Sequence, residues 1–451
     1  MASITKDYTK GSIPKQLFFF MIPFMLSNAL QVLYSAVDMV IVGRFVGSAG
    51  LAAVAQGSQI VNFAVMFFMG FSTGGQTLIA QIIGAQKRSE LNKVIGTLFS
   101  SIFLFGIVFT LFLVLPRDAI LHLVNMPEEG FDMAKSYVLI CGGGVIFTAG
   151  YNCVASVLRG MGDSKRPFIF ITIASLTNLV LDILFTGIFG WGVPGAAAAT
   201  ILGQAFSFIL SIVYLYKRKE AFGFDFKRSS FAIDSNYFKI IVKQGIPMAV
   251  QSAVVNISFI FVSALVNSMG VIAAATFGVG IKIDDVCTRI SAGVQFASAP
   301  MVGQNYAAKK FDRVKQVVYF SWIFSFIYTF AFLAYYLPFG DSLFALFTND
   351  PAVIAMSADF RYAIFWEFLF LCIMRGTNGL IQGIGFANLS LALGILDGVV
   401  LRIGLSVLFG LVFNMGFVGF VLGFGLAPIG ISIPGMIYFF SGKWKTRKAL
   451  V

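Results

Sequence analysis

One long apolar run of the chain carries a carboxylate near its centre. Residues 22–45 read IPFMLSNALQVLYSAVDMVIVGRF, and Asp38 lies well inside them. Ser27, Gln31, Tyr34 and Asp38 are spaced by four, three and four residues, which places them on one helix face. An ionised group at mid-bilayer costs roughly 3 kcal/mol or more, so this face should meet protein or water. We expect a functional carboxylate; the alternative is a structural one that is hydrogen-bonded to neighbouring helices.

Three further apolar runs carry polar faces that could join Asp38. Asn178 and Asp182 share a helix face in SLTNLVLDILFTG, and Asn152 and Thr200 lie in the flanking runs. Two carboxylates close together in a medium of low dielectric constant cannot both ionise easily, which suits proton binding. Oxygen ligands from Asp, Asn and Thr also suit Na⁺. The alternative is a set of separate helix–helix hydrogen bonds, each worth only ~0.6–2 kcal/mol.

The second half of the chain places basic residues inside its apolar runs. Lys282, Asp285 and Arg289 are spaced as i, i+3 and i+7, and Arg375 lies in a later run. Either the charges pair with one another or they line a substrate cavity, in which case the substrate could be anionic or zwitterionic. The candidate cavity residues are Gln31, Tyr34, Met66, Asn256, Lys282, Asp285, Arg289 and Arg375.

The composition is that of a polytopic membrane protein. The chain is 58% hydrophobic and only 12% charged, about half the charged fraction of a soluble domain. Its net charge of +12 does not indicate nucleic-acid binding, because the basic residues lie in short segments between apolar runs. The four cysteines all fall inside apolar runs without metal-ligand spacing, so we expect no disulfide, no resident metal and no cofactor. No cleavable signal is visible in residues 1–16.

The apolar runs predict twelve membrane spans. They lie near residues 17–42, 51–82, 94–115, 135–158, 168–189, 195–216, 240–266, 272–304, 316–338, 358–383, 389–412 and 417–440. If the N-terminus is cytoplasmic, most of the 32 Lys and Arg residues fall in the cytoplasmic segments. The positive-inside rule therefore favours cytoplasmic N- and C-termini.

The two halves of the chain resemble each other at an offset of 223–224 residues. GFSTGGQTLIAQIIGAQK (70–87) aligns with GVQFASAPMVGQNYAAKK (293–310), and Pro23 aligns with Pro247. Each half holds six spans, so both halves enter the membrane from the same side. We expect an all-α protein with two pseudo-symmetric six-helix lobes. The predicted parts are a cytoplasmic segment 1–16, an N-lobe 17–216, a basic linker 217–239, a C-lobe 240–440 and a cytoplasmic tail 441–451.

The chain resembles the MATE (multidrug and toxic compound extrusion) family, and its DinF-like branch most closely. The resemblance covers residues 14–445 and rests on LRGMGDSKRP (158–167), NLVLDILF (178–185) and GVPGAAAATILGQ (192–204). It implies a cation site at the positions of Asp38, Asn152, Asn178, Asp182 and Thr200. It also implies a bend of the first helix at Pro23, where proline removes a backbone hydrogen bond.

The NorM-like branch of that family is proposed to use a Glu in helix 7 and an Asp in helix 10. In this chain the seventh span offers only neutral polar residues such as Asn256, and the tenth offers Glu367 and Arg375. A NorM-like cation site in the second lobe is therefore not expected.

The resemblance predicts a secondary active multidrug efflux transporter rather than an enzyme. It would export organic, often cationic, compounds by antiport with H⁺ or Na⁺ through alternating access. We expect a monomer in a prokaryotic plasma membrane, with small organic substrates and the lipid bilayer as its only partners. The alternatives are a flippase for lipids or lipid-linked sugars and, from another class, an intramembrane enzyme. A flippase would move lipid head groups, whereas an enzyme would release a new product.

Overall fold

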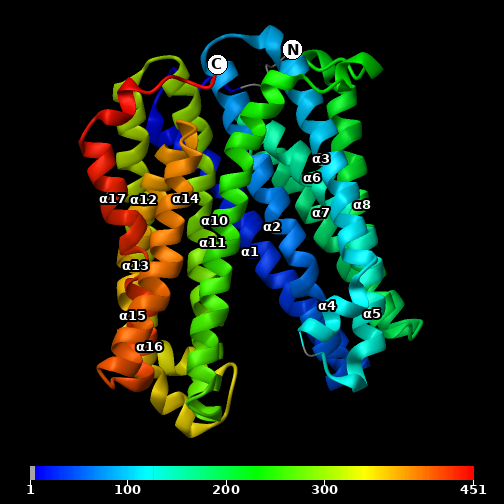
Figure 1. The fold of residues 1–451 in the computed structure, drawn as a ribbon, viewed down its shortest axis with the longest axis vertical. Coiled ribbons are helices and arrows are strands. Elements are labelled where there is room, and N and C mark those ends of the chain that lie inside the picture. The colour runs from blue at the N-terminus through cyan, green and yellow to red at the C-terminus, as the bar shows by residue number, and fades with distance from the viewer. Residues whose placement is uncertain (1–5, 125) are drawn as a thin grey trace. The chain divides into compact units, whose positions relative to one another are not determined.

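The computed structural model describes residues 6–124 and 126–451, and all regular elements in these ranges are helical (Figure 1). Within these ranges, ten helices are long and apolar enough to cross a membrane, and α5 and α6, bent by 42° at their junction, are long and apolar enough only when taken together. The main elements are α1 (Ile13–Phe45), α2 (Ser48–Gly84), α3 (Leu91–Val114), α4 (Arg117–Leu123), α5 (Glu128–Gly143), α6 (Val145–Gly160), α7 (Lys165–Asp182), α8 (Gly192–Lys217), α10 (Ser235–Asn267), α11 (Val271–Ala307), α12 (Phe311–Ala345), α13 (Pro351–Gly383), α14 (Ala387–Ile395), α15 (Gly404–Val407), α16 (Gly416–Leu426) and α17 (Ile429–Phe440).

The eighth predicted span, 272–304, coincides with α11. This helix has 37 residues, which is long enough to cross a bilayer. It differs from the other spans because Lys282, Asp284, Asp285 and Arg289 interrupt its apolar sequence. Each of the twelve predicted ranges thus falls on helical structure, with ends that differ by a few residues.

Three segments of the described chain are π-helices, among them η5 (Leu408–Val412), which follows α15. A π-helix, η2 (Ile183–Ile188), directly follows α7, and a second, η4 (Leu396–Ile403), directly follows α14. A π-turn is wider than an α-turn and is common at functional sites. Asp182 directly precedes η2, and η4 itself contains two charged residues, Asp397 and Arg402.

The contacts divide the chain into two compact units, which we call unit 1 and unit 2. Leu26–Ala249 makes up the body of unit 1, and Tyr8–Met25 together with Val250–Val451 makes up unit 2. The predicted lobes, 17–216 and 240–440, differ from these units because α1 and α10 each belong partly to both. The crossing point in each helix lies two residues beyond a proline, Pro23 in α1 and Pro247 in α10.

Glycines allow these half-helices to pack closely. In unit 1 a Cβ atom on Gly70 of α2 would lie 2.6 Å from the backbone of Ala249 in α10. In unit 2 a Cβ atom on Gly293 of α11 would lie 2.8 Å from the backbone nitrogen of Met25 in α1. Gly70 and Gly293 occupy equivalent positions of the sequence repeat. Small residues at both contacts allow the backbones to approach, as is common between membrane helices.

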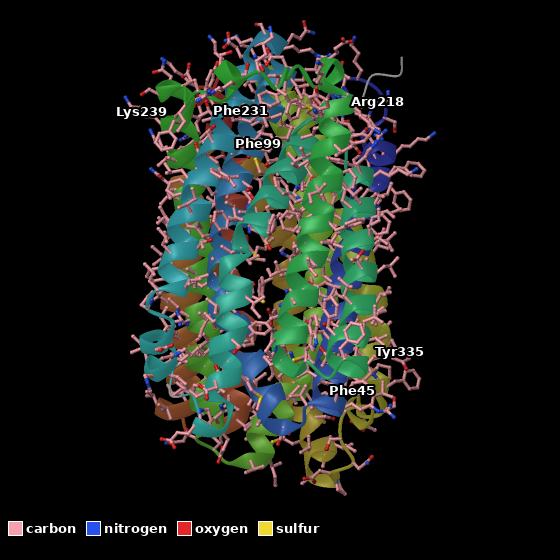
Figure 2. The ribbon with its side chains drawn as sticks, turned by 90° about the vertical axis from the view of Figure 1, so that its right-hand side faces the viewer. Phe45, Phe99, Arg218, Phe231, Lys239 and Tyr335 are labelled. Atoms are coloured by element: carbon pink, nitrogen blue, oxygen red, sulfur yellow. The ribbon has the colours of Figure 1, made fainter. Side chains whose placement is uncertain are left out.

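The basic segment after α8 packs against α3 within unit 1. Ser100 Oγ donates a hydrogen bond of 2.6 Å to the Phe231 carbonyl oxygen, and the rings of Phe99 and Phe231 are 6.3 Å apart. Figure 2 shows Phe99 and Phe231 near the end of unit 1 that also carries Arg218 and Lys239. The predicted linker is therefore an ordered part of unit 1.

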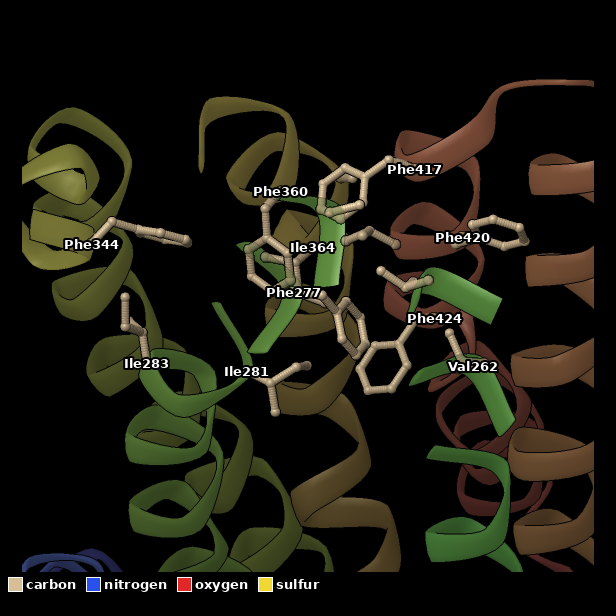
Figure 3. Packing of buried hydrophobic residues seen from close by; sticks show 14 of the residues in the cluster. Val262, Phe277, Ile281, Ile283, Phe344, Phe360, Ile364, Phe417, Phe420 and Phe424 are labelled. Atoms are coloured by element: carbon tan, nitrogen blue, oxygen red, sulfur yellow. The ribbon is translucent and has the colours of Figure 1, made fainter. Parts of the chain in front are cut away.

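Unit 2 contains an aromatic core built by α11, α13 and α16 (Figure 3). Phe277, Phe360 and Phe424 are buried, and the rings of Phe277 and Phe424 meet edge to face at 5.9 Å. Ile281 and Ile364 belong to the same buried cluster. This core makes the interior of unit 2 strongly apolar.

Candidate functional site

The Asp38 and Asp182 carboxyl groups lie within hydrogen-bonding reach of each other in unit 1. Asp38 comes from the part of α1 that belongs to unit 1 and is half-buried, whereas Asp182 ends α7 and is 1% exposed. Among the described residues, no N–H or O–H group is oriented to donate to Asp38 Oδ1 or to either Asp182 oxygen. Two ionised carboxylates cannot hydrogen-bond to each other, so a bond between them requires one bound proton.

Asn178 and Thr200 connect α7 with α8 beside this pair. Asn178 Nδ2 donates to Thr200 Oγ1 at 3.4 Å, and Thr200 Oγ1 donates to the Ala196 carbonyl oxygen at 3.0 Å. Asn178 also lies beside the Asp182 carboxyl group. Gly203 allows the close approach of the two helices, because a Cβ atom there would lie 2.9 Å from a backbone oxygen of α7. The structure thus brings four of the five predicted residues together.

Asn152, the fifth predicted residue, uses its amide group within its own helix. It lies on α6 and is buried, and its Nδ2 atom donates to the Thr148 carbonyl oxygen at 2.9 Å. This donor therefore points to the backbone of α6 rather than to either carboxylate. A role for Asn152 in cation binding stays a prediction.

Tyr137 and Cys141 of α5 belong to the same neighbourhood, and the sequence interpretation missed them. Both side chains lie close enough to Asp38 to interact with its charge, and Cys141 also interacts with the charge of Asp182. Both side chains are buried, 5% and 2% exposed. Their i, i+4 spacing in an apolar run was a signal that could have found them. Tyr34, a predicted cavity residue, is also close enough for both aspartates to act on it.

The other predicted cavity residues differ in their exposure. Arg375 is buried, Met66 and Asp285 are half-buried, and Gln31, Asn256, Lys282 and Arg289 are exposed. Asn256 Nδ2 donates to the Ser252 carbonyl oxygen within α10 at 3.0 Å. Arg289 pairs with Asp285 at 3.3 Å. A common substrate surface formed by these residues stays a prediction.

Pro23 lies inside α1, which continues as one helix from Ile13 to Phe45. It precedes the point where α1 passes from unit 2 to unit 1, whereas Asp38 lies beyond that point. A flexible position at Pro23 would therefore separate the carboxylate pair from the first part of the helix. The role of Pro23 as a flex point stays a prediction.

Helical spans in two repeated sets, with a buried carboxylate pair, define a polytopic membrane transporter of the internal-repeat class. The chain belongs to the MatE family, whose model matches residues 23–184 and again residues 247–408. The two matches begin 224 residues apart. This confirms the internal repeat and the family that the sequence predicted.

Relatives and solved structures agree with this assignment. The chain is 29% identical to "Probable multidrug resistance protein YpnP" of Bacillus subtilis over 98% of both chains. It is 25% identical to "Probable multidrug resistance protein NorM" of Thermotoga maritima, covering 99% of this chain and 97% of that protein. A solved outward-facing MATE family transporter has the same fold, with a TM-score of 0.90, 21% identity and 98% coverage of both chains.

Proposed function

We propose that this protein is a secondary active multidrug efflux transporter that exports organic compounds by antiport with a cation. The observation that carries the proposal is the pair of half-buried Asp38 and buried Asp182 in unit 1, which has no basic partner within hydrogen-bonding distance among the described residues. The names of its relatives supply the substrate class, since they are multidrug resistance and multidrug export proteins.

The geometry favours H⁺ over Na⁺ as the coupling cation. Two carboxyl groups within hydrogen-bonding reach of each other can share one proton, and the shared proton removes their mutual repulsion. A proton that enters down a membrane potential of 100 mV supplies about 2.3 kcal/mol. That energy corresponds to a roughly fifty-fold substrate gradient.

Protonation of the Asp38–Asp182 pair would change the preferred position of α1 by removing the repulsion between the two carboxylates. With the shared proton absent, Asp38 and Asp182 repel each other, and the repulsion favours a different position of the unit-1 part of α1. Proton binding removes this repulsion. The crossing point after Pro23 would absorb the change, so that a bend in α1 accompanies alternating access.

We also propose that both termini are cytoplasmic, that the membrane is a prokaryotic plasma membrane and that the protein works as a monomer. The orientation rests on the clustering of Lys and Arg at one set of helix ends. A flippase that holds a phosphate with Arg375 is less well supported. That side chain is buried and donates to Ser291 Oγ, Gln295 Oε1 and the Thr288 carbonyl oxygen.

The test is efflux of a fluorescent cationic dye from proteoliposomes with an imposed pH gradient or an imposed Na⁺ gradient. We expect the pH gradient to drive efflux in the wild type and to fail in Asp38→Asn and Asp182→Asn. Asp118→Asn is the control, because this carboxylate lies between the predicted spans and is paired with Lys135. Efflux driven only by Na⁺, or undiminished in both unit-1 variants, would contradict the assignment.

A further inference from the structure

Unit 1 has an apolar groove between α3 and α8, which we call the α3–α8 groove. Its cavity volume is about 550 Å³, and small-molecule sites commonly have volumes of ~300–1,000 Å³. Phe103 and Ile107 of α3 line one side, and Ile209 and Val213 of α8 line the other. These four side chains are 41–59% exposed. The groove therefore opens toward the lipid of the membrane rather than toward the core of unit 1.

The two sides of the α3–α8 groove are fixed by α6, which packs against both α3 and α8. On α6, a Cβ atom at Gly150 would lie 2.5 Å from the Phe208 ring of α8. On α3, a Cβ atom at Gly106 would lie 3.1 Å from the Ile146 side chain of α6. Glycine at both contacts lets the helices approach closely, as is common between membrane helices.

The segment after α8 closes one end of the groove with two aromatic rings. Phe226 and Phe231 both line the groove, and their rings lie 6.4 Å apart. Phe226 has a φ of +58°, a left-handed conformation that is rare for a bulky residue and persists only where the surrounding structure holds it. Ser100 is the one polar side chain among the described residues that line the groove, and its hydroxyl group already donates to the Phe231 carbonyl oxygen. The lining therefore suits a hydrocarbon chain.

Hydrogen bonds to α3 hold this aromatic segment in place. Asn92 Nδ2 donates to Ser230 Oγ at 3.1 Å, and Asn92 Oδ1 accepts a hydrogen bond from the Asp225 backbone nitrogen at 3.3 Å. Further along, the Asp234 backbone nitrogen donates to Thr97 Oγ1 at 3.0 Å. The two rings are therefore fixed parts of the groove.

Basic side chains surround the end of the groove that the two rings close. Five exposed basic residues lie there: Lys217, Arg218, Lys219, Lys227 and Arg228. The first of them lies ~6 Å beyond Val213 along α8, and the last two directly follow Phe226. Glu220 and Asp225 are the acids of the same segment, so five bases and two acids give residues 217–228 a formal charge of +3. Figure 2 shows Phe231 and Arg218 at the same end of unit 1.

The length of the groove matches one leaflet of a bilayer. Between Phe99 and Ile107, both of which line the groove, α3 rises by ~12 Å, and half of the hydrocarbon core measures ~15 Å. Tyr216 lies at the basic end and is 57% exposed, and exposed aromatic residues are typical of the membrane–water interface. An acyl chain in the groove thus brings its head group to the basic residues.

We propose that the α3–α8 groove binds one anionic phospholipid. Its acyl chain lies between α3 and α8, and its phosphate is held by Lys227, Arg228 and the basic end of α8. The excess positive charge selects an anionic head group over a zwitterionic one, because Lys and Arg clusters beside a membrane helix attract anionic lipids. The inference does not rest on the proposed function, since lipid binding is measured without transport.

The test is native mass spectrometry of the purified full-length protein, delipidated in detergent. The protein is titrated with phosphatidylglycerol, which is anionic, or with phosphatidylcholine of the same acyl chains, which is zwitterionic. We expect one tightly bound phosphatidylglycerol molecule and phosphatidylcholine binding that is weaker by at least about tenfold.

Lys227→Gln/Arg228→Gln should weaken phosphatidylglycerol binding by roughly 25-fold, since each basic side chain near the membrane surface contributes a factor of about five. Binding of phosphatidylcholine should stay unchanged. Lys443→Gln/Lys448→Gln is the matched control, because it removes the same charge from exposed residues of unit 2. Val213→Trp, which places an indole ring in the groove, should weaken the binding of both lipids.

Equal binding of the two lipids by the wild type would overturn the proposal, as would a preference for phosphatidylglycerol that survives in Lys227→Gln/Arg228→Gln. Binding that Val213→Trp leaves unchanged, in a protein with the circular dichroism of the wild type, would also overturn it. The mass spectrum reports dimers as well. A wild-type dimer that is lost in Val213→Trp would assign the groove to a second copy of the chain instead of a lipid.

Discussion

Replacing Arg402 by Met should strongly destabilise unit 2. The Arg402–Asp397 pair has an N–O distance of 3.3 Å, and its side chains are only 7% and 3% exposed. At that distance, with an effective dielectric constant of about 20, the attraction is about 5 kcal/mol. Removing one partner of a buried pair typically costs about 3–5 kcal/mol, because the other charge stays buried. We expect a loss of that size at neutral pH.

The chain offers a matched control for this prediction. Arg289 and Asp285 on α11 form a pair with the same 3.3 Å distance, but the side chains are 60% and 35% exposed. Exposed pairs contribute only about 0–1 kcal/mol, so Arg289→Met should change stability little. The double variant Arg402→Met/Asp397→Leu should recover most of the loss, since an apolar replacement of a buried pair is often neutral.

The assay is chemical unfolding of the purified protein in detergent, followed by tryptophan fluorescence. Three of the four tryptophans, Trp322, Trp366 and Trp444, lie in unit 2 and report on its unfolding. The loss in Arg402→Met should shrink as the pH falls, because protonation of Asp397 removes the unpaired charge. Equal losses in Arg402→Met and Arg289→Met would refute the reasoning that burial, rather than distance, sets the cost.

Three further predictions concern the helix contacts. Pro247→Ala should restore the missing helix hydrogen bond, which is worth up to about 3 kcal/mol in a helix interior. We expect the stiffer helix to slow dye efflux without lowering thermal stability. Unchanged efflux would contradict a bend of α10 at Pro247. Gly70→Ala should lower the free energy of unfolding by about 1–3 kcal/mol, because the new Cβ atom would lie 2.6 Å from the backbone of Ala249. Gly143→Ala is the control, since a Cβ atom there would meet no atom within 4 Å. This second variant should be neutral or stabilising by ~1 kcal/mol. The hydrogen bond from Lys135 holds the pKa of Asp118 below its ordinary 3.8. The stabilisation that this ionised carboxylate gives the fold is therefore present above pH 3.8 and is lost as the pH falls through the lower pKa of the folded protein. Lys135→Met should remove this acid dependence from thermal unfolding.

Local spacing was sufficient to find most of the carboxylate site. Asp38, Asn178 and Asp182 stand out because each interrupts an apolar run, and a polar group in a membrane span needs a protein partner. Their meeting within unit 1 follows from helix packing that the internal repeat and the family resemblance indicated. Tyr137 and Cys141 were missed because both are ordinary in an apolar helix, and only the packing of α5 places them near Asp38.

The buried ion pair between Arg402 and Asp397 shows why helical periodicity alone cannot identify every pair of interacting residues. Asp397 and Arg402 are five residues apart, a spacing that directs side chains away from each other in an α-helix. The π-helix η4 has a wider turn, and it brings them to 3.3 Å. Sequence alone placed Glu367 and Arg375 within the tenth predicted span, but it did not reveal that the fold buries both side chains.

The sequence by itself determined the membrane class, the positions of the helices, the repeat and the polar residues within the spans, because hydropathy and helical period act locally along the chain. Only the tertiary structure decided which charges become partners and where each unit ends. The first part of α1 joins unit 2 and the first part of α10 joins unit 1. That exchange depends on the close approach of Gly70 and Gly293 to distant backbone segments, and such long-range contacts leave no periodic signal in the sequence.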